Sequence, residues 1–268
     1  MHAGKNIRLK RLFNTNSQRT VIVPMDHGVS VGAISGLINF TDTIQKIVEG
    51  GANAILGHKK LLTQGTAHLS CGVGRILHLS SSTDLSDFPN KKVLTATVED
   101  AIRCGADAVS IHVNLGNEHE PAMLKDFGTV AGMCDRWNIP LLAMVYARGK
   151  HVHQFDPATV AHCARVAVEL GADIVKVPYT GDMESFSLVT QSSCVPVVIA
   201  GGEKMKTTKD FLRIVHDSVQ AGGAGLSVGR NIFQHESPQQ LTQALCAIVH
   251  DNKTVDEALI ILGDTSHA

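Results

Sequence analysis

The sequence predicts an α/β protein of one domain, residues 1–268, folded as a closed (β/α)8 barrel with parallel strands. Three observations predict it. The length of 268 residues suits one such barrel. A helix-ending Gly-Ala pair followed by an apolar, strand-like run recurs along the chain. Apolar strand-like runs also alternate with helix-like runs, which favours parallel pairing with right-handed crossovers.

The Gly-Ala repeat accounts for half of the expected strands. Its copies begin at Gly51, Gly105 and Gly171, and a looser copy begins at Gly223. Each interval exceeds one strand–helix–strand unit of about 30 residues, so we expect another strand between successive copies. The candidates for these strands, together with a first strand before the repeat, are residues 20–25, 76–79, 141–146 and 196–200. The count is eight, as a TIM barrel requires.

Helix-like segments fill the intervals between the expected strands. They comprise a segment after Thr41 and residues 99–104, 122–137, 157–170, 208–221 and 238–250. Thr41, Asp156 and Ser237 are expected N-caps.

Three segments lie outside the eight expected units. A weak amphipathic pattern predicts an extra N-terminal helix within residues 1–19, and another pattern predicts an extra C-terminal helix from about Val255. We expect this last helix to form a lid or a subunit contact. Residues 80–95 are rich in Ser, Asp, Pro and Asn, which predicts a long insertion after the third strand.

Composition excludes several classes of function. The formal net charge is -1 and aromatic residues make up 4% of the chain, so nucleic acid is not an expected partner. No apolar run approaches membrane-spanning length, so no membrane is expected either. The six cysteines are scattered, and the opening stretch carries several basic residues instead of a secretory signal. We therefore expect a cytoplasmic protein with reduced thiols.

Lys176 interrupts an otherwise apolar, strand-like run within residues 171–178. Such a strand is typical of a parallel sheet that is covered on both faces. A buried lysine is costly unless it is ion-paired or neutral. Lys176 is therefore either a structural, ion-paired lysine or an amine that attacks carbonyl groups.

The remaining polar residues follow the ends of the expected strands, where barrels of this kind place their active sites. Gly201-Gly202 and Gly229-Arg230 end the last two strands, and these positions commonly bind phosphate through backbone N–H groups. Asp26 and Tyr146 end two other strands. Either residue could be structural, but a lysine, an acid, a phenol and a phosphate site on one rim favour Schiff-base chemistry on a phosphorylated ketose.

A metal-dependent aldolase is a rival hypothesis, because His27, His58, His78 and His112 fall near strand ends. The sequence contains no tightly spaced metal motif such as H-E-x-x-H. We therefore expect neither a metal nor another cofactor. A third hypothesis is a non-catalytic barrel that only binds a phosphorylated sugar.

Six motifs carry a family resemblance, and it spans the chain from about Ile7 to Leu262. They are Val23–Gly28, Val109–Asn114, Ala143–Gly149, Asp173–Lys176 with Tyr179–Asp182, Ala200–Gly202 and Val228–Gln234. With these motifs the chain resembles the archaeal-type class I fructose-bisphosphate aldolase family. Some members of this family cleave fructose 1,6-bisphosphate or use dihydroxyacetone phosphate. Another branch joins a ketose-phosphate-derived fragment to aspartate semialdehyde, on a route to aromatic precursors.

The resemblance implies a role for each matching residue. Lys176 would form the Schiff base, Tyr146 would donate a proton and Asp26 would accept one. The residues implied to contact the sugar phosphate are Asp26, His27, Gly28, Val29, Ser30, Tyr146, Ala147, Arg148, Gly201, Gly202, Gly229 and Arg230. The implied partners are a phosphorylated ketose, a small aldehyde and further copies of the chain in a homo-oligomer. One departure is Val177-Pro178, where the family pattern has small polar residues.

Overall fold

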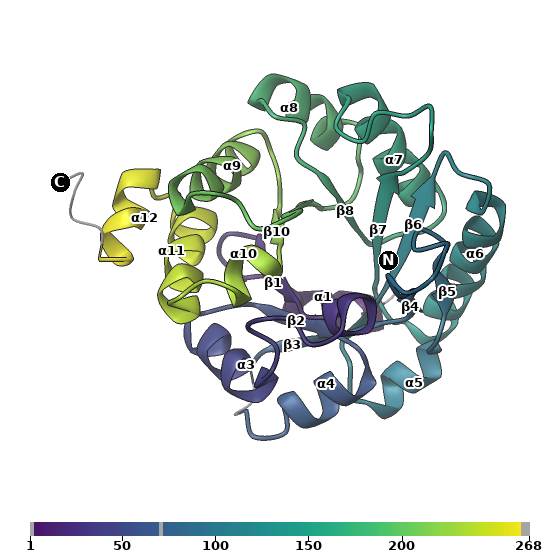
Figure 1. Cartoon of the computed structure of the whole chain (residues 1–268), viewed down its shortest axis with the longest axis horizontal. Helices are drawn as coiled ribbons and strands as arrows, with labels where there is room; N and C mark the ends of the chain where they lie inside the picture. Colours follow the sequence, from purple (N-terminus) through teal and green to yellow (C-terminus); the bar gives the residue numbers. More distant parts are fainter. Residues whose placement is uncertain (1–2, 70–71, 264–268) are drawn as a thin grey trace.

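The computed structural model describes residues 3–69 and 72–263, and within them eight parallel strands close into a barrel inside a ring of helices (Figure 1). Neighbouring strands follow one another in chain order around the ring. The barrel strands are β1 (Thr20–Pro24), β2 (Ala54–Gly57), β3 (Gly74–His78), β6 (Ala108–Leu115), β7 (Leu141–Ala147), β8 (Ile174–Pro178), β9 (Val197–Ala200) and β10 (Gly225–Ser227). The predicted fold class and all eight predicted strands are confirmed.

The outer ring contains helices that pack against the strands. They are α3 (Phe40–Glu49), α4 (Lys59–Gly65), α5 (Val98–Arg103), α6 (Glu120–Trp137), α7 (Pro157–Glu169), α8 (Met183–Gln191), α9 (Thr208–Gln220) and α11 (Pro238–Asp251). The sequence did not predict α4 or α8. It also placed the cap of α3 wrongly, since the side chain of Asn39 and not of Thr41 accepts from the backbone N–H of Asp42. Asp156 caps α7 as predicted, by accepting from Thr159 N.

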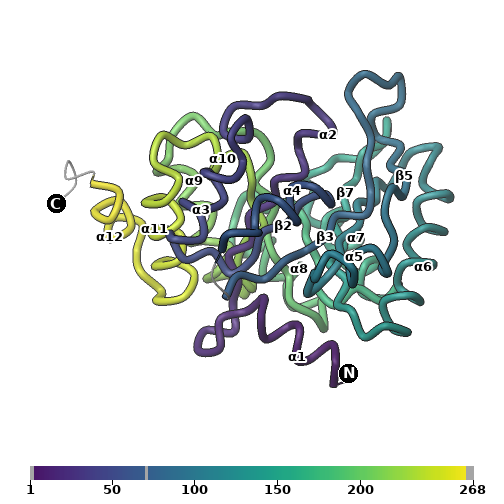
Figure 2. Tube along the Cα trace, turned by 90° about the horizontal axis from the view of Figure 1, so that it is seen from below, coloured from purple at the N-terminus to yellow at the C-terminus, as the bar shows by residue number. Residues whose placement is uncertain are grey.

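Several elements lie outside the eight units. They are α1 (Ala3–Leu12), α2 (His27–Val31), α10 (Arg230–Phe233), α12 (Val255–Ile261) and an antiparallel pair formed by β4 (Ser80–Ser81) and β5 (Val93–Leu94). Figure 2 shows α1 at one end of the barrel, and α2 and the loop between β4 and β5 at the other. Helix α12 packs against α9 and α11 at the periphery. None of its described residues lines the cavity at the barrel mouth, so the lid alternative is wrong.

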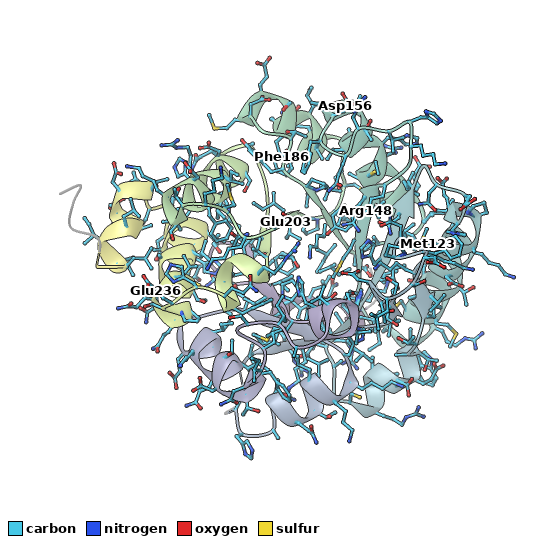
Figure 3. The ribbon with its side chains drawn as sticks, viewed as in Figure 1. Met123, Arg148, Asp156, Phe186, Glu203 and Glu236 are labelled. Carbon is cyan, nitrogen blue, oxygen red and sulfur yellow. The ribbon has the colours of Figure 1, made fainter. Side chains whose placement is uncertain are left out.

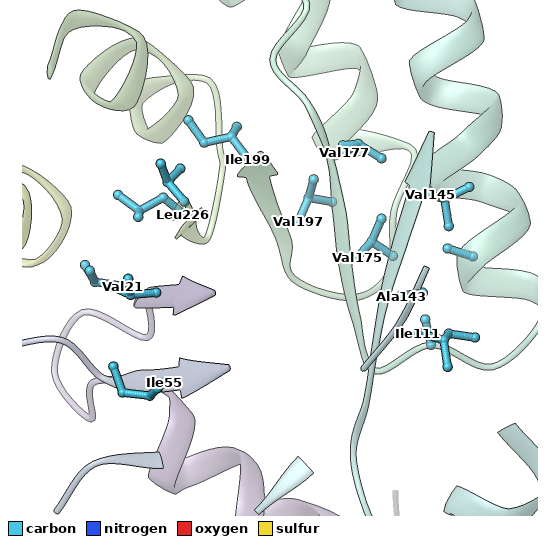
Figure 4. Packing of buried hydrophobic residues seen from close by; sticks show 14 of the residues in the cluster. Val21, Ile55, Ile111, Ala143, Val145, Val175, Val177, Val197, Ile199 and Leu226 are labelled. Atoms are coloured by element: carbon cyan, nitrogen blue, oxygen red, sulfur yellow. The ribbon is translucent and has the colours of Figure 1, made fainter. Parts of the chain in front are cut away.

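The core has two parts because side chains alternate across each strand. Residues that point outward from the ring, such as Val21, Val175 and Val197, pack beneath the helices (Figure 4). Residues that point inward fill the barrel, and Leu12 of α1 is fully buried among them. Helix α1 therefore closes this end of the barrel.

The third residue of the Gly-Ala repeat links neighbouring strands at the end of the barrel that α1 covers. Asn53 accepts from the backbone N–H of Val21, and Asp173 accepts from that of Leu141, at 2.7 and 2.9 Å. Asp107 does the same for Arg75 at 3.1 Å. Each bond satisfies one N–H group, on the first or second residue of a strand that precedes the repeat. The repeat is therefore a structural device at the end of the barrel opposite the strands' carboxyl ends.

Across residues 3–69 and 72–263, no helix combines the length and the apolar character that crossing a membrane would require.

Candidate active site

A cavity of about 670 Å³ opens at the carboxyl ends of the barrel strands. Its lining includes side chains from strand ends around the ring and from the insertion after β3. In Figure 3, Arg148 and Glu203 lie over the mouth of the ring, whereas Asp156 belongs to the outer ring. The cavity is the place where a (β/α)8 barrel is expected to hold its active site.

Lys176 points into this cavity from the inward face of β8. The residue is 7% exposed, and its Nζ lies 3.9 Å from Sδ of Met144 on the neighbouring strand. It forms no ion pair with any carboxylate in the described part of the chain. Burial lowers the pKa of Lys176 to about 8, with Arg148 and Arg230 adding to the effect and Asp26 opposing it. The structural, ion-paired alternative for this lysine is therefore wrong.

Lys5 shows what an ion-paired buried lysine looks like in the same protein. It lies in α1, is 5% exposed, and its Nζ is 2.9 Å from Oδ2 of Asp173 and 2.7 Å from Oδ1 of Asp135. Burial acts to lower its pKa, but the two carboxylates reverse the shift and raise it. The two buried lysines therefore occupy opposite ends of the barrel in opposite electrostatic environments.

Asp26 follows β1 and stands among ionisable side chains of the cavity. Its carboxylate oxygens lie 3.7 Å from Nδ1 of His27 and 3.7 Å from Nε2 of His78. Burial acts to raise the pKa of Asp26, but the neighbouring His78, His27 and Lys176 outweigh it and hold the pKa well below its usual range. Asp26 is therefore a carboxylate at neutral pH and can accept a proton.

His78, which the sequence suggests only as a metal ligand, is an uncharged neighbour of Asp26. Its ring is 3% exposed, and Nδ1 lies 2.8 Å from Oγ of Ser110 on the adjacent strand. Burial lowers the pKa of His78 to about 4, against the opposing effect of Asp26. The ring of His58 lies 5.4 Å from that of His78 and its pKa is also lowered, chiefly by burial.

Tyr146 stands above Lys176 on the inward side of the barrel. Met144 is the register partner of Lys176, and Tyr146 lies two residues further along β7, so it points to the same side. The guanidinium of Arg148 lies 5.0 Å from the Tyr146 ring centroid. Burial raises the pKa of the phenol, so Tyr146 keeps its proton at neutral pH.

The ends of β9 and β10 form a backbone cradle in which side chains are excluded. A Cβ on Gly201 would lie 2.2 Å from Cγ1 of Val228, and one on Gly229 would lie 2.4 Å from the carbonyl oxygen of Pro24. Gly202 has φ of 62°, a conformation that favours glycine. Arg230 lines the cavity beside these glycines.

Asn231 holds the cradle in place, and sequence reasoning missed it. Its Nδ2 donates to the carbonyl oxygens of Gly201 and Glu203 at 3.1 and 3.0 Å, and its Oδ1 accepts from Met205 N at 2.7 Å. Asn231 is 5% exposed, so these bonds form away from water. One side chain thus joins the loop after β9 to the segment after β10.

The structure brings together most, but not all, of the residues implied to contact a sugar phosphate. Gly28, Val29 and Ala147 are not among the described lining residues, whereas the other nine are. Ala147 is 5% exposed and packs in the outer core instead. The missed lining residues include Asn90 and Lys92 of the insertion.

The structure shows where Asp182 and Pro178 lie, two residues to which sequence reasoning assigned no role. Asp182 caps α8 by accepting from Ser185 N at 2.9 Å. Pro178 is the last residue of β8 and lines the cavity, paired in register with Ala200. Of the two residues that depart from the family pattern, Pro178 therefore falls within the candidate site, whereas Val177 packs in the outer core.

Within the described ranges, no group of three or more His, Cys, Asp and Glu side chains has a metal-binding arrangement. The four histidines near strand ends are thus not assembled into a metal site by the residues that the structure describes.

Comparison with known proteins assigns this geometry to a family. A family model described as DeoC/LacD family aldolase matches residues 20–235. The 2-amino-3,7-dideoxy-D-threo-hept-6-ulosonate synthase of Halobacterium salinarum is 42% identical over 262 residues, which are 97% of each chain. The 2-amino-4,5-dihydroxy-6-oxo-7-(phosphonooxy)heptanoate synthase of Streptomyces griseus is 39% identical over 252 residues, 94% of this chain and 92% of that one.

Solved structures agree with these relatives. An archaeal fructose 1,6-bisphosphate aldolase superimposes with a TM-score of 0.83 at 29% identity, over 92% of this chain and 99% of that one. A second structure, of a Schiff-base-forming fructose-1,6-bisphosphate aldolase, gives 0.84 at 28% identity, over 92% of this chain and all of that one (100%).

Proposed function

Because this chain belongs to the DeoC/LacD aldolase family, we propose that it is a class I aldolase or transaldolase that acts on a phosphorylated ketose through a Schiff base at Lys176. The observation that carries the proposal is the unpaired amine of Lys176, buried in the mouth of the barrel with its pKa lowered to about 8. At neutral pH about a tenth of such an amine is uncharged, compared with well under a hundredth for an exposed lysine. The uncharged form is the nucleophile.

In the proposed reaction, Nζ of Lys176 attacks the ketone carbon of the bound ketose phosphate. Tyr146 donates a proton to the resulting hydroxyl group, which leaves as water and yields an iminium ion. Asp26 takes the proton of the hydroxyl group on the β-carbon, and the bond between the α- and β-carbons breaks. An aldehyde departs, and the electron pair of the broken bond moves toward the iminium nitrogen and leaves an enamine.

The enamine then reacts with the second substrate. Its nucleophilic carbon attacks the aldehyde carbon of the acceptor, and the aldehyde oxygen receives the proton held by Asp26. Water hydrolyses the new imine, which releases the product ketone and regenerates the amine of Lys176. The cradle of Gly201, Gly202 and Gly229, with Arg230 beside it, would hold the phosphate throughout and so keep the ketone aligned with Lys176.

The relatives favour an acceptor that is an amino acid aldehyde. Both curated names describe seven-carbon, 2-amino acid products with a ketone at carbon 6. Aspartate semialdehyde supplies the amino acid end of such a product, and the ketose phosphate supplies the ketone end. We therefore propose a synthase of this type, and fructose-bisphosphate aldolase activity is the second candidate, favoured by the two solved structures.

Trapping with borohydride tests the Schiff base directly. The protein is incubated in turn with fructose 1,6-bisphosphate, fructose 1-phosphate and dihydroxyacetone phosphate, reduced, and mapped by peptide mass spectrometry. We expect added mass at Lys176 and none at Lys5 or Lys91, which lie outside the cavity. A folded protein without an adduct at Lys176 would contradict the proposal and favour a barrel that only binds phosphorylated sugars. Loss of activity with a chelator would instead favour a metal-dependent aldolase.

We also propose that the protein works in the cytoplasm as a homo-oligomer. The described cysteines, Cys104, Cys134, Cys163, Cys194 and Cys246, are free thiols, which suits a reducing compartment. Exposed apolar side chains such as Leu188 and Ile260 on the outer helices suit contacts between copies. Light scattering of the purified protein measures the subunit number, and a monomer at micromolar concentration would contradict the oligomer.

A further inference from the structure

Two cationic side chains, Lys92 and Arg148, line the cavity away from the glycine cradle. Lys92 comes from the insertion after β3, and Arg148 directly follows β7. Neither forms an ion pair with a carboxylate of the described residues. Two unneutralised cations that face the same cavity repel each other, and burial together with Arg148 lowers the pKa of Lys92.

The neighbours of these two side chains hold them in position without neutralising them. Nζ of Lys92 donates to Oγ of Ser82, and a guanidinium nitrogen of Arg148 lies 3.4 Å from Oδ1 of Asn90. Asn114 of β6 anchors the insertion by donating to the carbonyl oxygen of Asn90 at 2.8 Å. Asp84 also lines the cavity, but its effect on the pKa of Lys92 is weaker than those of burial and Arg148.

The order of strands places Lys92 and Arg148 on the side of Lys176 opposite the cradle. Strand β8, which carries Lys176, lies between β9 and β7 in the ring. The cradle follows β9 and β10, whereas Arg148 follows β7, and Lys92 enters from the connection between β3 and β6. A ketone joined to Lys176 would therefore extend toward the cradle at one end and toward the two cations at the other.

We propose that Lys92 and Arg148 form a second anion subsite, which binds the carboxylate or phosphate carried by the acceptor aldehyde. This inference rests on the proposed function and deepens it by assigning residues to the second substrate. The product name of the Streptomyces griseus relative has this layout: a ketone at carbon 6, a phosphate on carbon 7 and a carboxylate at carbon 1. On this pattern the carboxylate is the favoured occupant. Charge-assisted hydrogen bonds from Lys and Arg suit such a group.

The test compares acceptors in the wild-type protein and in Lys92→Met, which removes the charge but keeps much of the apolar stem. The acceptors are aspartate semialdehyde, glyceraldehyde 3-phosphate and neutral glyceraldehyde, each with the same ketose phosphate donor. We expect the preference for the anionic acceptors over glyceraldehyde, as a ratio of kcat/KM values, to fall roughly 10- to 100-fold. Lys92→Arg should restore most of it. A larger loss for aspartate semialdehyde identifies the carboxylate as the occupant, and a larger loss for the phosphate identifies the phosphate.

Lys91→Met is the matched control, because Lys91 is exposed, adjacent in sequence and outside the cavity lining. It should leave the ratio unchanged. An unchanged ratio in Lys92→Met, in a protein that still traps the donor at Lys176, would overturn the subsite while leaving the Schiff-base proposal intact.

A binding measurement keeps the two proposals separable. L-homoserine carries an alcohol where aspartate semialdehyde carries the aldehyde, so it can occupy the subsite without reacting. Calorimetry should show its dissociation constant rise at least tenfold in Lys92→Met and stay constant in Lys91→Met. A tenfold weaker binding of L-homoserine by Lys92→Met, in a protein that traps no donor, would support the subsite and contradict the Schiff-base proposal. Equal binding by all three proteins would count against the subsite whether or not trapping succeeds.

Discussion

Met144 and Lys176 are register partners on adjacent strands, and the thioether sulfur of one lies 3.9 Å from the amine of the other. The neighbour of the candidate nucleophile is thus a weak, uncharged acceptor where an acid could have stood. A substitution of Met144 alone can therefore place a negative charge beside the amine.

We therefore expect Met144→Glu to raise the pKa of Lys176 above the present value of about 8, because an adjacent carboxylate favours the ammonium form. Schiff-base formation in the wild-type protein should rise with pH up to about 8 and then level off. In the variant the rise should move to higher pH, and the rate at pH 7 should fall about tenfold for every pH unit by which the profile moves. Rates of borohydride trapping measured against pH give both profiles. Met144→Leu, which adds no charge, should keep the wild-type profile; the same displacement in both variants would refute this explanation.

Tyr146→Phe should slow the loss of water that forms the imine. The change removes the phenol that we propose as the proton donor while keeping the ring beneath Arg148. Loss of one acid–base group typically costs about 10²–10⁴-fold in rate. We expect turnover and the rate of borohydride trapping at Lys176 to fall together within this range. Full turnover in the variant would exclude the assigned role.

Lys176→Met should make the protein more stable, although it abolishes turnover. The folded protein binds the Lys176 proton more weakly than the unfolded chain does, since the pKa falls from 10.5 to about 8. Below pH 8 this difference destabilises the folded state by about 3 kcal/mol, and the penalty disappears as pH rises from about 8 toward 10.5. Urea unfolding of both proteins at pH 7 and pH 10 measures it. Equal stabilities at pH 7 would mean that burial of the ammonium carries no cost here.

Lys5→Met should have the opposite effect on stability. It leaves the carboxylate of Asp173, which is 8% exposed, without its cation, and breaking a buried ion pair costs about 3–5 kcal/mol. The paired ammonium has a raised pKa, so its contribution is complete below the unfolded value of 10.5 and is lost as pH rises through the folded value. Thermal unfolding at pH 7 should show a lower midpoint, while the Schiff base still forms at temperatures where the variant is folded. A stability equal to that of the wild type would show that the pair contributes nothing.

Asn231→Ala should weaken phosphate binding without removing a group of the chemical step. The change removes the bonds to the carbonyl oxygens of Gly201 and Glu203 and to Met205 N, so the two segments of the cradle lose their connection. We expect KM for the ketose phosphate to rise about tenfold or more, since each lost bond is worth about 1 kcal/mol. The matched control is the same ketose without its phosphate, whose kcat/KM should change much less. Equal losses for the two substrates would point to general damage and not to the cradle.

The sequence predicted the ring of strands well because each strand carries a local signal. An apolar strand needs cover on both faces, and eight of them, four of which follow the Gly-Ala repeat, can close into a ring. Lys176, Asp26 and the glycines that follow β9 and β10 were also predictable, since strand direction alone places them at one end of the barrel.

The missed residues depend on contacts between segments that are distant in the sequence. Lys92 gives no signal of its own because its segment looks like a polar insertion, and distant contacts such as the bond from Asn114 to Asn90 bring that segment over the cavity. Asn231 gives no signal of its own either, because its three bonds to the loop after β9 exist only once the barrel has closed. Asn39 replaces Thr41 as the cap because of the precise start of α3, which propensity does not resolve.

The Asn and Asp bonds of the Gly-Ala repeat each connect residues 32 positions apart. Such short sequence separations allow pairs of neighbouring strands to lock as independent modules before the full ring has formed. All three bonds lie at the end of the barrel away from the cavity. Substitutions in the loops at the cavity end can therefore change the choice of acceptor while these bonds continue to hold the strands together.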